Sequence, residues 1–349
     1  MDAADIPTRE KILALPKVDL HCHLDGSMRV ETIEELAVEQ KVTLPTTDPQ
    51  KLRHILLCGR NAGSLEEFLK AFDLTLMVLQ DKDGLARAAY DLACDAADEN
   101  IWYLEVRFSP ILHQNNGLRL SEIVDAVLEG LKKAEQEKKI RTGVIICGMR
   151  HMSPAISLRL AQLAVAYKNR GVVGFDLAGA EQGFPPKHHI EAFYLIRNNN
   201  INCTVHAGEG YGPESIHQAI HYCGAHRIGH CTRLREDGDL LNYVADRRIP
   251  LEICLTSNVQ TGTVKSIEDH PFQLYFDYSL RVTLNTDNRL MSNTTVTDEY
   301  LLAAETFNLN MKDLKNIVIQ GFRSSFLSYR DRVALLREAL DELKIPYLP

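Results

Sequence analysis

The stretch KVDLHCHLDGS, residues 17–27, decides the fold, because an apolar run ends here in two histidines and a turn. Side chains in a strand alternate between its two faces, so His21 and His23 point the same way and Cys22 points the other way. Asp25 and Gly26 behind them are typical of a turn. The stretch therefore predicts a buried strand whose end brings two imidazoles towards one point.

Seven further runs rich in Val, Ile, Leu and Tyr follow, each ending in polar or small residues. In order they are IWYLEVRFSP (101–110), TGVIICGM (142–149), GVVGFDLAG (171–179), INCTVHAGE (201–209), HRIGHC (226–231), PLEICLTSN (250–258) and LRVTLNTDN (280–288). Their continuous apolar character is typical of parallel strands that are buried on both faces. Helical patterns separate them, as at 120–139, 153–169 and 213–223. Eight strands alternating with helices predict an α/β fold, the (β/α)8 TIM barrel.

The length of the chain suits one such barrel, so we expect a single domain over residues 1–349. The stretch from about 30 to 95 reads as mainly helical and is too long for one crossover, which predicts a helical insertion after the first strand. A helix at about 331–343 is expected to close the chain. A doubly wound sheet is the competing fold, but it would call for a glycine-rich phosphate loop, and neither GxGxxG nor GxxxxGK[ST] is present.

Composition and charge exclude several classes of partner. With 45% hydrophobic and 25% charged residues the chain is typical of a soluble globular protein. A net charge of −8 argues against nucleic acid or an anionic membrane, although not against a nucleoside, which carries no phosphate. No apolar run is long enough to span a membrane, and no signal peptide is visible. The eight cysteines form no CxxC pair, so we expect reduced, buried thiols in a cytoplasmic protein.

Polar residues gather at the predicted strand ends, where a barrel carries its active site. His206 follows the fifth strand and Asp287 the eighth, so both are expected at the rim that holds His21 and His23. Three histidines and one carboxylate suit zinc and leave room for a water. Each has an ordinary explanation when taken alone: a half-exposed HxH strand, a satisfied buried histidine, or an aspartate that caps a helix. The combination at strand ends favours a shared metal site.

Two more residues at the same rim suggest proton chemistry. Glu209 lies three residues after His206, close enough to approach the metal without binding it, and burial would raise its pKa for proton transfer. The alternative is a stabilising acid ahead of the helix at 213–223. His230 at the end of the sixth strand could orient the water, or could simply be a core histidine. The predicted chemistry is hydrolytic attack on an electrophilic carbon, because zinc lowers the pKa of a bound water to roughly 7.

These motifs resemble the adenosine deaminase family over essentially the whole chain. HCHLDGS, EVRFSP, DLAGAE, TVHAGE, RIGH and LNTDN stand in the family's order and spacing. The resemblance implies a barrel with one zinc ion per chain that converts adenosine, and 2′-deoxyadenosine beside it, to inosine and ammonia in purine salvage. It implies no oligomeric state.

The resemblance also implies roles for individual residues. Zinc-bound hydroxide attacks purine C6 while Glu209 delivers a proton to N1, His230 orients the hydroxide, and Asp287 accepts a proton from the water. The implied zinc ligands are His21, His23, His206 and Asp287. The implied substrate contacts are His23, Asp25 at the ribose 5′-hydroxyl, the Gly179 N–H at purine N3, Asn288 at N7, and an apolar lid of Phe68, Leu69 and Phe72. For Asp25 and Gly179 a plain turn, and for the lid a packed amphipathic helix, are the alternatives.

Three positions depart from the family pattern. Asn288 stands where many members carry a second aspartate, and an Asn amide donates a hydrogen bond without titrating, so we expect the contact to survive. Cys231 follows His230 where glycine is usual, and Ala180 replaces a common aspartate after Gly179.

Rival functions remain open at this point. Another purine deaminase on the same barrel would act on adenine or a modified adenine nucleoside, and a substrate panel would distinguish it. A two-metal phosphodiesterase or amidohydrolase would often use a lysine at a mid-chain strand end, but DLAGAE (176–181) has none. A secreted, non-enzymatic relative fits poorly with the complete ligand set. The unrelated cytidine-type zinc deaminases need HxE with PCxxC, and PCxxC is missing.

Overall fold

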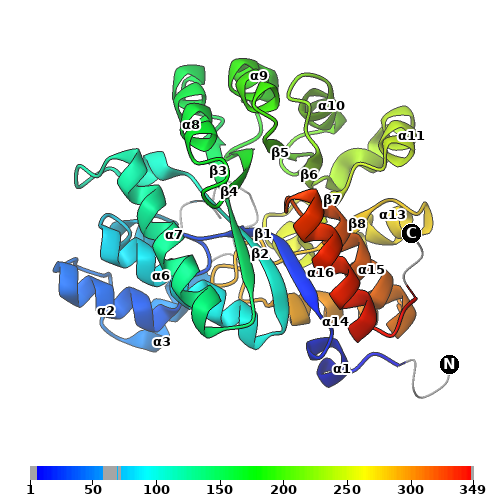
Figure 1. The fold of residues 1–349 in the computed structure, drawn as a ribbon, viewed down its shortest axis with the longest axis horizontal. Coiled ribbons are helices and arrows are strands. Elements are labelled where there is room, and N and C mark those ends of the chain that lie inside the picture. Colours follow the sequence, from blue (N-terminus) through cyan, green and yellow to red (C-terminus); the bar gives the residue numbers. More distant parts are fainter. Residues whose placement is uncertain (1–5, 58–68, 70–71, 347–349) are drawn as a thin grey trace.

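The protein forms a barrel of eight parallel strands in the computed structural model, which describes residues 6–57, 69 and 72–346 (Figure 1). The strands pair in chain order: β1 (Lys17–His23), β2 (Ile101–Phe108), β3 (Arg141–Met149), β4 (Val172–Ala178), β5 (Asn202–Ala207), β6 (Arg227–His230), β7 (Leu251–Ile253) and β8 (Val282–Leu284). Beyond β8, the Asp287 N–H donates to the His21 carbonyl at 2.7 Å and the His23 N–H donates to the Asp287 carbonyl at 2.7 Å. These two bonds join the last strand to the first at the rim, and the predicted TIM barrel is confirmed.

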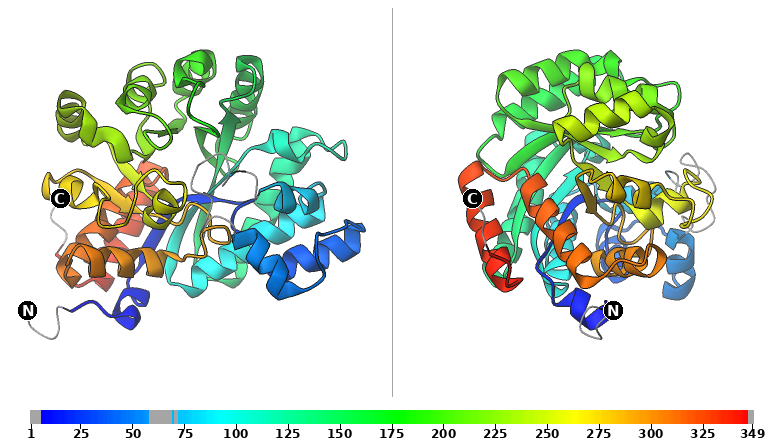
Figure 2. Two further views of the ribbon diagram at one scale, coloured as in Figure 1. Left: turned by 180° about the vertical axis from the view of Figure 1, so that it is seen from behind. Right: turned by 90° about the vertical axis from the view of Figure 1, so that its right-hand side faces the viewer.

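Helices cover the outside of the barrel (Figure 2). They are α6 (Lys82–Asp98), α7 (Leu120–Glu137), α8 (Pro154–Ala166), α9 (Ile190–Asn198), α10 (Pro213–His221), α11 (Gly238–Arg247), α13 (Phe272–Asp277), α14 (Val296–Thr306), α15 (Met311–Ser324) and α16 (Tyr329–Glu342). Shorter elements are α1 (Arg9–Leu13), α12 (Leu255–Gln260) and the 3-10 turns η3 (Pro110–His113), η4 (Pro186–His189) and η5 (Thr232–Glu236). The closing helix expected at about 331–343 is α16.

The expected insertion after the first strand is helical. In the described residues it contains α2 (Val30–Gln40), α3 (Pro49–Leu56) and α5 (Phe72–Val78), which precede α6. Asp48 caps α3 by accepting from the N–H groups of Gln50 and Lys51, and Pro49 fits the first turn because its missing N–H would have no partner there. The preceding α2 ends at Gln40, where Lys41 adopts the left-handed conformation, so α2 and α3 are separate helices.

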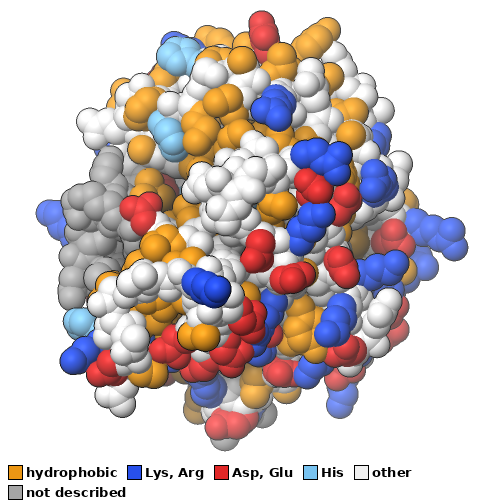
Figure 3. All heavy atoms as spheres, turned by 90° about the vertical axis from the view of Figure 1, so that its left-hand side faces the viewer, with side chains coloured by type: hydrophobic (Ala, Val, Ile, Leu, Met, Phe, Trp, Pro, Cys, Tyr) orange, Lys and Arg blue, Asp and Glu red, His pale blue; other side chains and the backbone are white. Residues whose placement is uncertain are grey.

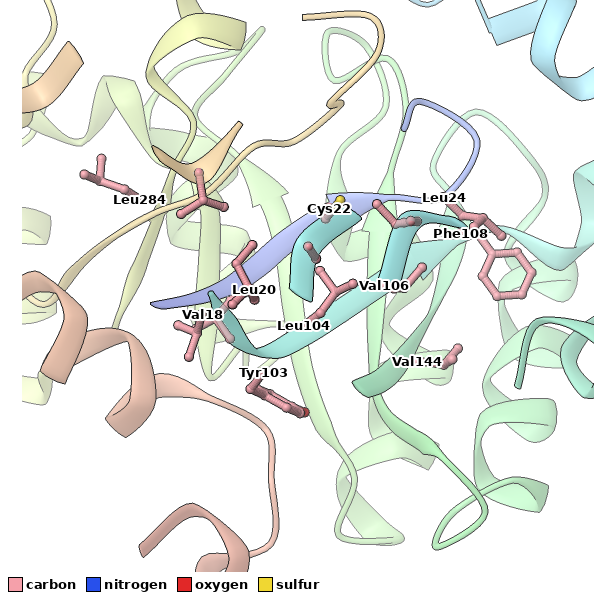
Figure 4. Packing of buried hydrophobic residues seen from close by; sticks show 14 of the residues in the cluster. Val18, Leu20, Cys22, Leu24, Tyr103, Leu104, Val106, Phe108, Val144 and Leu284 are labelled. Carbon is pink, nitrogen blue, oxygen red and sulfur yellow. The ribbon is translucent and has the colours of Figure 1, made fainter. Parts of the chain in front are cut away.

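Alternation along the strands divides the side chains between two environments. On β1, the even-numbered Val18, Leu20 and Cys22 are at most 1% exposed and pack with Leu104 and Val106 of β2 between the sheet and the helices (Figure 4). Burying a side chain such as leucine stabilises the fold by about 1.5–3 kcal/mol. The odd-numbered residues of β1 consequently face the barrel interior, which orients both strand histidines inward.

The barrel interior carries paired charges as well as apolar groups. The Arg107 guanidinium donates to Asp176 at 3.0 Å and to Glu252 at 2.9 Å. Arg227 donates to Glu252 at 2.5 Å and also pairs with Glu105. All five side chains are at most 1% exposed. Burial removes the water that would solvate each charge, so each depends on its oppositely charged partner instead. The pairs link β2, β4, β6 and β7 beneath the rim.

One predicted strand end is wrong. The run PLEICLTSN was expected to end as strand at LTSN, but β7 stops at Ile253 and Leu255–Gln260 forms α12. The last bond from β8 to β7 runs from the Asn285 N–H to the Ile253 carbonyl at 2.9 Å. Beyond it the chain bonds to itself, and the Asn258 N–H donates to the Cys254 carbonyl at 2.9 Å. Ser257 and Asn258 therefore reach the rim from a helix.

The surface agrees with the composition. Acidic and basic side chains lie interspersed on the face that Figure 3 shows. Among the described helices, none is long and apolar enough to cross a membrane. The described cysteines, seven of the eight in the chain, are all free and buried, as expected.

Candidate metal and catalytic site

Four side chains converge at the rim of the barrel. His21 and His23 come from β1, His206 from β5, and Asp287 from the segment after β8. One ligand atom from each lies within 4.8 Å of all the others. Nε2 of His23 is 3.1 Å from Nε2 of His206, and Oδ1 of Asp287 is 3.3 Å from Nε2 of His21 and 3.4 Å from Nε2 of His23. The structure thus brings together the whole predicted ligand set.

The spacing suits a small ion with tetrahedral ligands. Zinc–nitrogen and zinc–oxygen bonds of about 2.0–2.1 Å at tetrahedral angles would separate neighbouring ligand atoms by about 3.3 Å. Nε2 of His21 is buried and makes no well-formed hydrogen bond to the described residues, and its 3.3 Å neighbour, Oδ1 of Asp287, is itself one of the four converging groups. A buried nitrogen without a partner is costly unless something else occupies its lone pair. The donor set and this nitrogen fit a bound metal ion.

Three of the four ligands are held from behind by a second group. Nδ1 of His21 lies 2.8 Å from Glu252, and Nδ1 of His206 lies 3.0 Å from Asp176. A carboxylate accepts the Nδ1 proton and leaves the Nε2 lone pair free to face a metal. Ser257 donates to Oδ2 of Asp287 at 2.6 Å, which leaves Oδ1 directed at the histidines. These three ligands are therefore oriented by the fold itself.

For His23, His206 and Asp287 the electrostatics favour the protonation states that a metal requires. At His21 burial lowers the pKa, but the contacts with Asp287 and Glu252 outweigh burial and raise it. Burial holds the pKa of His23 well below its usual value and also lowers the pKa of His206. Burial opposes ionisation of Asp287, but its bond with His21 and the surrounding imidazoles hold its pKa well below the ordinary carboxyl range. Neutral imidazoles and an ionised carboxylate are the forms that coordinate metals.

The backbone at the rim adopts unusual conformations. His230 has φ of 61°, Cys231 56° and Asp287 60°, in the left-handed region that glycine adopts easily. Each such residue costs on the order of 1–3 kcal/mol and is retained where the surroundings determine it, often at functional sites. The φ of 56° at Cys231 is a physical reason why glycine is usual at this position in the family that the sequence resembles, since glycine adopts such angles easily.

Glu209 is held by a carboxylate that the sequence analysis did not single out. Glu181, which follows β4, accepts from the backbone N–H groups of Gly208, Glu209 and Tyr211 at 2.7, 2.9 and 3.0 Å. These bonds fix the loop between β5 and α10. Burial, the charge of Asp287 and the charge of Glu181 raise the pKa of Glu209 well above its usual value. This shift favours the protonated form of Glu209, which is the form that its predicted role needs.

His230 lies beside both Glu209 and the metal ligands. Its Nε2 is 3.5 Å from Oε2 of Glu209, and its ring centroid is 4.7 Å from that of His21. Burial holds its pKa well below the usual value, so the ring is neutral. A neutral imidazole here can donate or accept one hydrogen bond at the site, depending on its tautomer.

A pocket of about 250 Å³ opens directly above these groups. His23, His206, Glu209, His230 and Asp287 line its base. The predicted substrate contacts Asp25, Gly179, Asn288, Leu69 and Phe72 line its walls. Phe68, the other predicted lid residue, lies outside the described residues.

Two details of the wall fit the predicted contacts. Gly179 has φ of 97°, which a side chain would resist, so its glycine serves the turn at the pocket wall. The Asn288 side chain packs on Gly26, where a Cβ would come within 1.8 Å of Oδ1. Oδ1 of Asn288 and Oδ1 of Asp25 are both buried without hydrogen-bond partners among the described residues, although both residues line the pocket. The buried Oδ1 of Asp25 lacks a donor such as the predicted ribose hydroxyl, whereas the predicted contact of Asn288 to N7 needs its NH2 group and not Oδ1.

Comparison with known proteins shows which family the chain resembles. A profile described as "Adenosine deaminase" matches residues 16–342. The chain is 44% identical to a "Probable adenosine deaminase" of Dictyostelium discoideum, over 97% of this chain and 44% of that protein. It is 41% identical to an "Adenosine deaminase" of Mycobacterium ulcerans, over 96% of this chain and 97% of that protein.

Solved structures of deaminases share the fold. An adenine deaminase from Arthrobacter aurescens superposes with a TM-score of 0.88 at 25% identity, over 95% of this chain and 99% of that one. An Arabidopsis N6-mAMP deaminase superposes with a TM-score of 0.85 at 29% identity, over 95% of this chain and 99% of that one.

Proposed function

The chain belongs to the adenosine deaminase family and is a hydrolytic deaminase, and we propose that it converts adenosine, with 2′-deoxyadenosine as a second substrate, to inosine and ammonia at the rim site. The observation that carries the proposal is the convergence of the ligand set with the buried Glu209 side chain at one pocket.

We propose zinc as the metal, held by His21, His23, His206 and Asp287, one ion per chain. Three nitrogens and one oxygen at this spacing suit zinc better than calcium or magnesium, which prefer all-oxygen sites. Bound here, zinc supplies Lewis-acid activation of water at neutral pH.

The residues around the base of the pocket divide the proton transfers. Glu209 donates its proton to purine N1, which makes C6 more electrophilic. Asp287 accepts a proton from the water that adds to C6, and His230 stabilises the negative charge that develops on its oxygen. The proton taken up by Asp287 then passes to the amino group, which leaves C6 as ammonia. The C6 hydroxyl loses its proton to Glu209 as the carbonyl forms, so both carboxyl groups return to their starting states. The burial that favours the protonated form of Glu209 supports this assignment, because an ionised carboxylate would have no proton to give.

The walls of the pocket support a nucleoside rather than a nucleotide. Among the described lining residues there is no lysine or arginine, whereas Asp25 and Asp73 are acidic. A phosphate in this pocket would meet negative charge and lose its water without compensation. We assign Asp25 to the ribose 5′-hydroxyl, the Gly179 N–H to N3, Asn288 to N7, and Leu69, Phe72 and Phe68 to the apolar cover. His23 contacts the substrate beside its role as a ligand.

A second candidate is deamination of adenine or of a modified adenine nucleoside, because an adenine deaminase and an N6-mAMP deaminase share this fold.

The net charge of −8 speaks against nucleic acid as a partner. The buried free cysteines support a cytoplasmic location, where thiols stay reduced.

A substrate panel tests the proposal. Adenosine, 2′-deoxyadenosine, adenine, AMP, N6-methyl-AMP and 5′-methylthioadenosine would be compared by ultraviolet absorbance with the zinc-loaded protein. We expect the two nucleosides to have the highest kcat/KM and AMP to be poor. A preference for adenine, or for AMP over adenosine, would contradict the assigned substrate.

A further inference from the structure

Behind His230 runs a chain of hydrogen bonds that ends in the backbone. Nδ1 of His230 lies 3.0 Å from Nδ2 of Asn258, whose Oδ1 lies 3.2 Å from Nε2 of His270. The Phe272 N–H donates to Nδ1 of His270 at 3.0 Å. The three side chains are at most 3% exposed, so water does not compete for these bonds. The chain connects the rim of β6 with α12 and with the start of α13.

The backbone N–H sets the direction of every bond in this chain. An N–H group can only donate, so Nδ1 of His270 accepts. Burial lowers the pKa of His270 to about 3, so its ring is neutral and carries its proton on Nε2. That proton is donated to Oδ1 of Asn258, which places the amide NH2 group opposite His230. If the amide were turned around, its NH2 group would face another N–H donor at His270.

We infer that Asn258 and His270 are positioning residues that fix His230 as the tautomer protonated on Nε2, so that an N–H donor permanently faces the reaction site. Because the Asn258 NH2 group donates to Nδ1 of His230, a neutral His230 must hold its proton on the opposite nitrogen. That nitrogen is the one 3.5 Å from Oε2 of Glu209.

The tautomer limits what His230 can do in the proposed reaction, and for this consequence the inference rests on the proposed function. With Nε2 protonated, the ring can donate to the oxygen that gains negative charge, and no bond to hydrogen is made or broken at His230. Taking a proton from water would require the second proton at Nδ1, against the Asn258 NH2 group. The proton of the water must therefore pass to a carboxylate, which is the role assigned to Asp287, because Glu209 enters the reaction as the proton donor.

The tautomer can be measured without substrate or turnover. Zinc-loaded protein labelled with 15N-histidine would be observed by NMR, and the His230 signals would be assigned as those lost in His230→Gln. We expect a protonated, pyrrole-like Nε2 and an unprotonated, pyridine-like Nδ1. A protonated Nδ1 in the wild-type protein would overturn the inference. Absent turnover of adenosine would contradict the proposed function instead, and would leave this measurement unaffected.

The variant Asn258→Asp reverses one bond at almost constant volume. A carboxylate accepts where the amide NH2 group donated, so we expect a proton to appear on Nδ1 of His230 and the pH profile of kcat to change, with zinc still at one ion per chain. An unprotonated Nδ1 in this zinc-loaded variant would refute the role of Asn258. A protonated Nδ1 with an unchanged pH profile would refute the catalytic consequence.

If Asn258→Asp does not fold, two matched variants of His270 test the same inference. The side-chain nitrogen of glutamine reaches about as far as Nε2 of histidine, so His270→Gln keeps the donor to Asn258, while His270→Leu removes it. We expect His270→Gln to retain the wild-type 15N pattern and most of kcat, and His270→Leu to show a mixture of His230 tautomers with kcat lowered at least ~10-fold. Equal spectra and equal kcat in the two variants would overturn the role of His270.

Discussion

At the scale of single residues, the proposed reaction depends most on the proton held by Glu209. Glu209→Gln keeps the size of the side chain but cannot release a proton. We expect kcat for adenosine to fall by at least ~100-fold, the order of magnitude that general acid–base catalysis supplies. Zinc content, measured by elemental analysis, is expected to stay at one per chain, because Glu209 is not among the four converging ligands. Wild-type turnover in this variant would exclude the assigned role.

Glu181 acts on the same group through the backbone. Its two oxygens accept three N–H groups, and Glu181→Gln would turn one acceptor into a donor facing them. We expect kcat to fall by about 10- to 100-fold, because small misplacements of a catalytic group are costly, with zinc content unchanged.

Glu214→Gln is the matched control for Glu181, since Glu214 lies in the first turn of the neighbouring α10 and is exposed. We expect it to keep wild-type turnover. If both variants lost kcat equally, the positioning role of Glu181 would not stand.

The side chains that converge at the rim could be predicted from the sequence, whereas the residues that hold them in place could not. His21, His23, His206 and Asp287 were predictable because all four follow apolar runs at the same end of predicted strands. Asp176, Glu252 and Arg107 are charged residues inside otherwise apolar strands, and this was the sign in the sequence that they have a special role. Their partners come from other strands, however, and pairing across the barrel is not visible in local sequence. Glu181 and Asn258 act through loop backbone and a helix, which strand periodicity does not describe.

At the scale of elements, α14 carries a buried acid whose ionisation opposes folding. Glu299 accepts from the Thr294 hydroxyl at 2.8 Å and from the Thr256 N–H at 3.3 Å, which ties α14 to α12. Burial raises its pKa from 4.5 to about 7. The folded state therefore binds more protons than the unfolded state between pH 4.5 and 7, so this group's contribution to stability is full below pH 4.5 and is lost as the pH rises to 7.

Glu299→Gln removes that dependence. Relative to the wild type, we expect the free energy of unfolding of the variant to rise between pH 4.5 and pH 8, by up to about 3 kcal/mol. Urea unfolding at both pH values measures the difference. Glu305→Gln, an exposed change on the same helix, should show no such trend, and an equal trend in both variants would contradict the assignment to Glu299.

The elements also show where periodicity misleads. Eight strands could be read from apolar runs, because burial on both faces leaves a continuous pattern. The residues LTSN continue the apolar pattern but form a helix. The last hydrogen bond to the neighbouring segment is at Ile253, and no strand in the described part of the chain lies beside the residues that follow it. Because the chain changes here from strand to helix, Ser257 and Asn258 reach the rim.

At the scale of the whole molecule, the paired charges inside the barrel connect folding with metal binding. Arg107 bridges Asp176 and Glu252, the two carboxylates that orient His206 and His21. Arg107→Met would leave both carboxylates short of a buried partner. We expect the free energy of unfolding to drop by about 3–5 kcal/mol, and zinc affinity to fall by about 10- to 100-fold.

Chelator competition measures the zinc affinity of Arg107→Met, and urea unfolding measures its stability. Arg141→Met, at the exposed start of β3, is the control and should change neither quantity appreciably. Unchanged zinc affinity in folded Arg107→Met would show that the interior charges do not support the metal site.

The central claim is that a metal at the rim and adenosine deamination belong to one site, and reconstitution tests it most directly. Adenosine turnover and zinc per chain would be measured on one preparation, first as purified, then after chelation, and then after stepwise return of zinc. Activity is expected to disappear on chelation and to return in proportion to zinc, reaching its maximum at one ion per chain. Full turnover in the chelated protein, or no turnover at one zinc per chain, would contradict the claim.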